Sequence, residues 1–246
     1  MIKKLFIFIL LFIAANSNAQ LILGANPSYH IPFGKEAGMG FGAQILIEKP
    51  SNERNSYFGK ISYFFPRKSV TKDAFVADAI DPNTQPSSLN LSMFTNYSTF
   101  SVEFGRRTYW INPIDYGFSI YGGTTMMISF SNVKNRLDSY NKNLYQLFGQ
   151  DGTSSDNNIN GKGNIFSLGI SLSGGMKYDI NHFGTVFLDL NFGYNFLQLA
   201  TNSIASQGYQ NLGSSLNFYF GLGYRKILFF NNAGRRNGNQ PQQRGY

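Results

Sequence analysis

The feature that most constrains this chain is an alternation of apolar and small polar residues with a period of two. Between Val186 and Phe196, apolar residues occupy every second position, and most residues between them are Asp, Asn or Gly. Successive side chains of a β-strand point to opposite faces, so this segment is expected to be a strand with one apolar face. The same alternation recurs in residues 116–131, 166–173 and 216–225. The chain is therefore expected to be all-β.

The polar face of these segments is unusual for strands that face water. Only 14% of the residues are charged, against about 25% in soluble domains, and the polar positions carry mainly Gly, Ser and Asn. Small polar side chains suit a cramped interior, whereas the broad aromatic-rich face suits lipid. We therefore expect the apolar side chains to point outward at acyl chains. Every backbone N–H and C=O must be paired in hydrocarbon, so the sheet is expected to close into a transmembrane barrel.

Composition excludes several other classes of protein. Aromatic residues make up 16% of the chain, which is far too many for a disordered protein. Cysteine is absent, which excludes a disulfide scaffold and a thiolate metal site. The net charge of +8 comes without a basic stripe or a recognition helix, so no nucleic-acid partner is expected.

Both ends of the chain are predicted to lie outside the barrel, which would occupy residues 20–230. Residues 1–19 are predicted to be a cleaved signal peptide, because two lysines precede a short apolar run and small residues near Ala19. Residues 231–246 are rich in Asn, Gln and Gly, a composition that predicts a disordered, basic periplasmic tail. The expected contacts of this tail with an envelope protein or with anionic headgroups are Arg235, Arg236 and Arg244.

Roughly eight strands are expected, each long enough for the about 9–11 residues that a tilted crossing needs. They lie near residues 21–33, 39–48, 57–65, 89–107, 116–131, 165–178, 185–197 and 215–230. Short connectors alternate with long ones, which is typical of outer-membrane barrels with both termini in the periplasm. A hairpin hidden in a long loop would make ten strands. The fourth strand changes phase near Tyr97–Phe100, at a bulge or where it leaves the membrane.

In this pattern the chain resembles the small eight-stranded outer-membrane β-barrels of the OmpA/OmpX type. The last strand is the most similar stretch, through its glycines and terminal aromatic residues. The residues that carry this resemblance are Gly221, Gly223, Tyr224, Phe229 and Phe230. The resemblance implies that this strand is read by the barrel-assembly machinery, in the outer membrane of a Gram-negative bacterium.

Six charged residues fall on the predicted inner face: Lys60, Glu103, Arg107, Lys177, Asp189 and Arg225. An eight-stranded barrel is only wide enough for side chains to fill it, and an unpaired buried ion costs several kcal/mol. These charges are therefore expected to form a salt-bridge network that plugs the lumen. A narrow polar conduit is the alternative.

Three aromatic residues near a predicted turn, Tyr109, Trp110 and Tyr116, are expected to lie at the headgroup level. In the longest loop, Leu137, Tyr140, Leu144 and Leu147 follow helical spacing, which predicts a short amphipathic helix. That helix would either cap the barrel mouth or present an apolar stripe to a partner. Cations in the outside loops predict contacts with outer-membrane lipid and with lipopolysaccharide phosphates.

No catalytic residue, cofactor or metal site is expected. Some small barrels modify lipids with a His, a Ser and a carboxylate, and His30, Ser28 and Glu48 would share the inner face. A lipid hydrolase needs these groups at the lipid edge instead. The sequence therefore predicts a structural or interaction role, such as a membrane-embedded accessory of a secretion or envelope-assembly complex. The alternatives are a narrow transport conduit and a lipid-modifying enzyme.

Overall fold

The computed structural model describes residues 20–33, 39–114, 117–147, 160–180, 183–202 and 215–229. These residues form nine β-strands: β1 (Gln20–Pro32), β2 (Gly40–Pro50), β3 (Asn55–Ala79), β4 (Ser88–Ile111), β5 (Phe118–Leu137), β6 (Tyr145–Leu147), β7 (Gly161–Ile180), β8 (Gly184–Ala200) and β9 (Leu216–Phe229). Within the described ranges, no helix is long and apolar enough to cross a membrane. The predicted signal peptide and tail lie outside the described residues.

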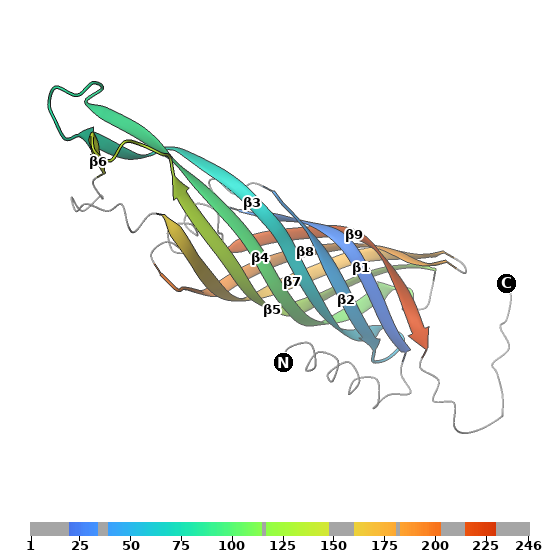
Figure 1. Cartoon of the computed structure of the whole chain (residues 1–246). Coiled ribbons are helices and arrows are strands. Elements are labelled where there is room, and N and C mark those ends of the chain that lie inside the picture. The colour runs from blue at the N-terminus through green and yellow to red at the C-terminus, as the bar shows by residue number, and fades with distance from the viewer. Residues whose placement is uncertain are drawn as a thin grey trace, which may run out of the picture.

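The strands close into an antiparallel barrel (Figure 1). Each strand pairs with its neighbours in the order β1, β2, β3, β4, β5, β7, β8, β9, and β9 pairs back onto β1. The short strand β6 lies outside this ring and, among the described residues, pairs with the end of β3 alone. The prediction of a closed, all-β antiparallel barrel of about eight strands is therefore confirmed.

Apolar side chains cover the outside of the barrel and polar ones fill the inside. On the outer wall, Met126 and Leu172 are each 64% exposed, whereas serine, threonine, asparagine and charged side chains are buried in the interior. The period of two dictates this division, because neighbouring residues of one strand take opposite faces. The described barrel therefore has an apolar outer surface and a polar interior, the reverse of a soluble barrel.

Strands β3 and β4 run far beyond the rest of the barrel and form an arm (Figure 1). The pairing of β2 with β3 ends at Phe64, but β3 continues along β4 to Asp78 and ends at Ala79. At about 3.3 Å per residue, this extension is on the order of 45 Å of strand. The opposite end of the barrel is the short-turn end, where β2 turns into β3, β4 into β5 and β7 into β8.

The phase change predicted in the fourth strand has a tertiary cause. The register of β4 against β5 runs without a shift from Met93 to Tyr109, so β4 has no bulge at Tyr97–Phe100. The extra residues lie on β3 instead, after Phe64 and after Thr71. Apolar residues change sides in β4 because Leu91 and Met93 face the arm's own apolar cluster rather than the polar lumen.

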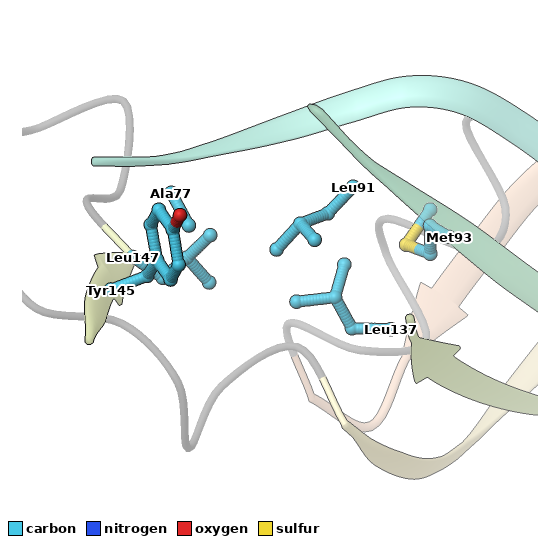
Figure 2. Close-up of a cluster of buried hydrophobic side chains, with 6 residues drawn as sticks. All are labelled: Ala77, Leu91, Met93, Leu137, Tyr145 and Leu147. Carbon is cyan, nitrogen blue, oxygen red and sulfur yellow. The ribbon is translucent and has the colours of Figure 1, made fainter. Parts of the chain in front are cut away.

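That apolar cluster joins the arm to the loop that follows β5. Six buried side chains from β3, β4, β5 and β6 converge in it: Ala77, Leu91, Met93, Leu137, Tyr145 and Leu147 (Figure 2). The predicted helix in this loop is wrong. Leu137 ends β5, a turn follows in which Leu144 and Tyr145 donate to the Asn141 carbonyl, and Leu147 lies in β6. The apolar face of the arm stabilises an extended segment where local spacing alone indicates a helix.

Candidate functional site

A buried ion-pair network crosses the barrel lumen. The Glu48 carboxylate of β2 accepts hydrogen bonds from Arg107 Nη1 at 3.0 Å and from Arg225 Nη1 at 2.8 Å. The Asp189 carboxylate of β8 accepts from Arg107 Nη2 at 3.0 Å and from Lys60 Nζ at 2.9 Å. All five side chains are at most 1% exposed. Arg107 thus bridges the two carboxylates, and five strands are joined through the lumen.

Two tyrosines complete this network. The Tyr109 hydroxyl donates to Glu48 Oε1 at 2.7 Å and accepts from Arg225 Nη1 at 2.9 Å. The Tyr121 hydroxyl donates to Asp189, and its ring lies 4.1 Å from the Arg107 guanidinium carbon. Gly175 makes room for this ring, since a Cβ there would lie 2.6 Å from the Tyr121 hydroxyl oxygen. Every carboxylate of the network therefore has both a cation and a hydroxyl donor.

The predicted position of Tyr109 at the headgroup level is wrong, because this side chain is fully buried in the lumen. Tyr109 is an even number of residues from Glu103 and Arg107 along the same strand, so its side chain lies on the same inner face. This parity is the sequence signal that places Tyr109 in the lumen. Its neighbour Trp110 is 63% exposed on the outer wall. Tyr116 lies outside the described residues.

The six predicted lumen charges are all buried inside the barrel, and Lys60, Arg107, Asp189 and Arg225 belong to the network described above. Lys177 pairs with Asp179 near the short-turn end. Glu103 is 1% exposed, and neither carboxylate oxygen has a hydrogen-bond partner among the described residues. Its cross-strand neighbour is Lys60, so three cations and three carboxylates balance at this level of the lumen. The sequence predicts that Glu48 lies on the inner face but does not predict its role in the network. In the structure Glu48 binds both Arg107 and Arg225.

Between the network and the arm end of the barrel, aromatic and amide side chains fill the lumen. His30 lies 2.8 Å from the Asn217 amide oxygen, through its Nε2, and its ring stacks on Tyr219 with centroids 4.6 Å apart. Ser28 Oγ has no hydrogen-bond partner in the described chain. His30 is therefore bonded to Asn217 and Glu48 is held by Arg107 and Arg225, so no hydrogen bond joins His30, Ser28 and Glu48 in the way that a hydrolase needs.

At the arm, the four loop residues with helical spacing have different environments. Leu137 and Leu147 are buried in the apolar cluster, Tyr140 packs against it, and Leu144 is 44% exposed. Exposed cations surround this end of the molecule: Lys68, Lys72, Lys134, Arg136, Lys142 and Lys162.

The closing strand β9 lies between β8 and β1. Gly221 and Gly223 allow close contact with β1, since a Cβ on either would lie within 2.4 Å of Asn26 side-chain atoms. Tyr224 packs on Phe183, with ring centroids 5.3 Å apart, and Phe229 pairs with Gln20 at the end of the strand. Phe230 and the tail residues Arg235, Arg236 and Arg244 lie outside the described residues. Recognition of β9 by the barrel-assembly machinery stays a prediction.

No family model and no curated protein sequence matches this chain. Among solved structures, it is similar to the Neisserial surface protein A, with 10% identity over 85% of this chain and 97% of that one and a TM-score of 0.47. It is also similar to the outer membrane protein OprG of Pseudomonas aeruginosa, with 10% identity over 84% and 95% and a TM-score of 0.45. Resemblance this distant transfers neither family nor function. The eight-stranded ring with outward apolar side chains is, by its own geometry, the architecture of the barrels that the sequence resembles.

Proposed function

We propose that this chain is a non-enzymatic interaction protein of a Gram-negative outer membrane, with a closed lumen and an external contact arm. Its short-turn end would face the periplasm, and the arm would serve as the membrane-embedded protein's contact with a larger envelope assembly. The observation that carries the proposal is the arm, because β3 and β4 build a separate apolar core beyond the barrel.

The outer wall supports insertion in a bilayer. Aromatic side chains form a band across β9, β1, β2 and β3 at the arm end of the barrel, with neighbouring ring centroids 4.9–5.7 Å apart: Phe220, Tyr29, Phe41, Phe65 and Tyr63. A second set, at the short-turn end, contains Tyr57, Trp110, Phe183 and Tyr224. Aromatic girdles at both interfaces, with an apolar band between them, are typical of transmembrane barrels.

The ion-pair network supports a closed lumen. Arg107 and Arg225 are 0% and 1% exposed. The Arg107 guanidinium is held by the carboxylates of Glu48 on β2 and Asp189 on β8, and the Arg225 guanidinium is held by Glu48. We expect the protein to show no stable conductance in planar bilayers. A steady single-channel conductance from the unmodified protein would contradict a contact role with a closed lumen and favour a conduit.

The arm is tested by crosslinking in living cells. Ile80 is 57% exposed beside β6, so a photoreactive residue at this position should capture a specific envelope protein. The same residue at Ser51, which is exposed in a short turn at the other end, is the matched control. Introducing Val76→Glu on the exposed face of the arm should abolish the crosslink at Ile80. Identical crosslinked species from both positions would contradict a contact role for the arm.

A further inference from the structure

The outer wall contains a groove that the proposed arm contact does not use. It has a volume of about 760 Å³, which lies within the range of about 300–1,000 Å³ of small-molecule sites. The groove runs across strands β3, β4, β5, β7 and β8 on the outer face of the barrel. We name it the wall groove.

Two rows of side chains in register form the wall groove. The row nearer the arm contains Phe104, Met126, Ile170 and Tyr194. The row nearer the short-turn end contains Tyr57, Arg106, Thr124, Leu172 and Phe192. Thr124 is small and lies between larger neighbours, so the wall is hollowed there. The lining is apolar apart from Arg106, Thr124, Thr125 and Ser171.

The wall groove is inclined along the barrel. Tyr57 is two residues from the start of β3 at Asn55, whereas Phe192 is eight residues from the start of β8 at Gly184. At about 3.3 Å per residue, the groove therefore climbs on the order of 20 Å along the strands, from the short-turn end towards mid-wall. An acyl chain that descends from the middle of a bilayer to a headgroup follows such a path.

Two cations lie at the lower end of the wall groove. Lys49, Tyr57 and Arg106 occupy one row across β2, β3 and β4, and both cations are exposed on the outer wall. Arg106 Nη2 donates to the Asn55 side-chain oxygen at 3.2 Å, which holds the guanidinium at this edge. An anionic headgroup beside Tyr57 would meet both positive charges, and its chain would enter an apolar channel.

We infer that the wall groove binds an anionic phospholipid of the leaflet at the short-turn end, with its phosphate at Arg106 and Lys49 and one acyl chain between the two rows. This inference rests on the proposed membrane insertion. Each cation near a membrane surface contributes about 1 kcal/mol to binding an anionic lipid, which is about fivefold in affinity.

Trp110 reports on this site. It is the single tryptophan of the chain. Trp110 lies on the same outer face of β4 as Arg106, four residues closer to the short-turn end, and packs over Gly122. The full chain, isolated from envelopes in detergent, is reconstituted in phosphatidylcholine vesicles. Trp110 fluorescence is then measured as phosphatidylglycerol or phosphatidylcholine with brominated chains replaces part of the lipid. We expect brominated phosphatidylglycerol to quench at lower mole fraction.

Variants separate the site from the general charge of the membrane surface. Arg106→Gln and Lys49→Gln should each lower the preference for phosphatidylglycerol about fivefold. Lys226→Gln removes an exposed cation of β9 at the same end but away from the groove, and should leave the preference unchanged. Thr124→Phe should fill the hollow and reduce quenching by phosphatidylglycerol. Heat-dependent gel migration verifies that every variant is folded.

Three results would overturn the inference. The first is equal quenching by both brominated lipids in the unmodified protein, and the second is an equal effect of Lys226→Gln and Arg106→Gln. The third is quenching that falls as the protein-to-lipid ratio rises, since a second copy would then cover the groove. If neither brominated lipid quenches Trp110 at all, membrane insertion itself fails, which separates that outcome from failure of the lipid site.

Discussion

Replacing Glu48 by Gln is expected to destabilise the barrel by about 3–5 kcal/mol, the cost of breaking a buried ion pair by removing one partner. Glu48 accepts hydrogen bonds from Arg107, Arg225, Tyr109 and Ser56. Arg107 keeps Asp189 in the variant. Arg225 keeps only the Tyr109 hydroxyl among the partners of its Nη1 atom. Most of the cost therefore falls on Arg225, which is left buried without a carboxylate.

The assay is equilibrium unfolding by urea in lipid vesicles, followed by circular dichroism. Glu103→Gln is the matched control, because Glu103 is equally buried but its carboxylate oxygens have no hydrogen-bond partner in the described chain. We expect this control to be neutral or stabilising. The double variant Glu48→Gln/Arg225→Gln should recover part of the loss, as the uncompensated charge is removed. A loss below about 1 kcal/mol for Glu48→Gln, or an equal loss for Glu103→Gln, would refute the reasoning.

Three further changes test other parts of the molecule. Leu91→Ala should lower the local stability of the arm by about 2–5 kcal/mol, because it leaves a cavity in the arm's apolar cluster. Proteolysis should then cut the arm while the barrel keeps its gel migration. Loss of the whole barrel would contradict a separate arm core. Tyr109→Phe should cost about 1–3 kcal/mol in urea unfolding, since the buried Glu48 and Arg225 lose a hydroxyl partner, and a neutral result would contradict its place in the network. Gly175→Ala should prevent refolding into vesicles, because its Cβ would lie 2.1 Å from the Leu188 carbonyl oxygen; normal refolding yields would show that the wall can shift there.

Much of the lumen follows from alternation alone. Lys60, Arg107 and Asp189 could be placed inside because each lies on the polar face of a strand whose other face is apolar. The expectation that Tyr109 lies at the headgroup level follows from its aromatic character, whereas its parity correctly indicates the lumen. The parity argument needs no partner strand, since side-chain direction is a local property of extended backbone.

Pairing within the lumen could not be predicted in the same way. Glu48 and Arg225 are 177 residues apart in sequence, and they meet only because β9 closes onto β1 and β1 lies beside β2. The extended course of residues 137–147 likewise depends on Ala77 and Leu91, which offer an apolar surface from other strands.

The amino-acid sequence by itself thus determined the closed barrel and the face on which each strand residue lies, since both follow from a period of two and from the need to pair every backbone group in lipid. Only the tertiary structure decided which charges pair, where the arm begins and where the outer wall is hollowed. These features depend on the stagger between strands and on side-chain volumes from several strands at once, and no local pattern contains that information.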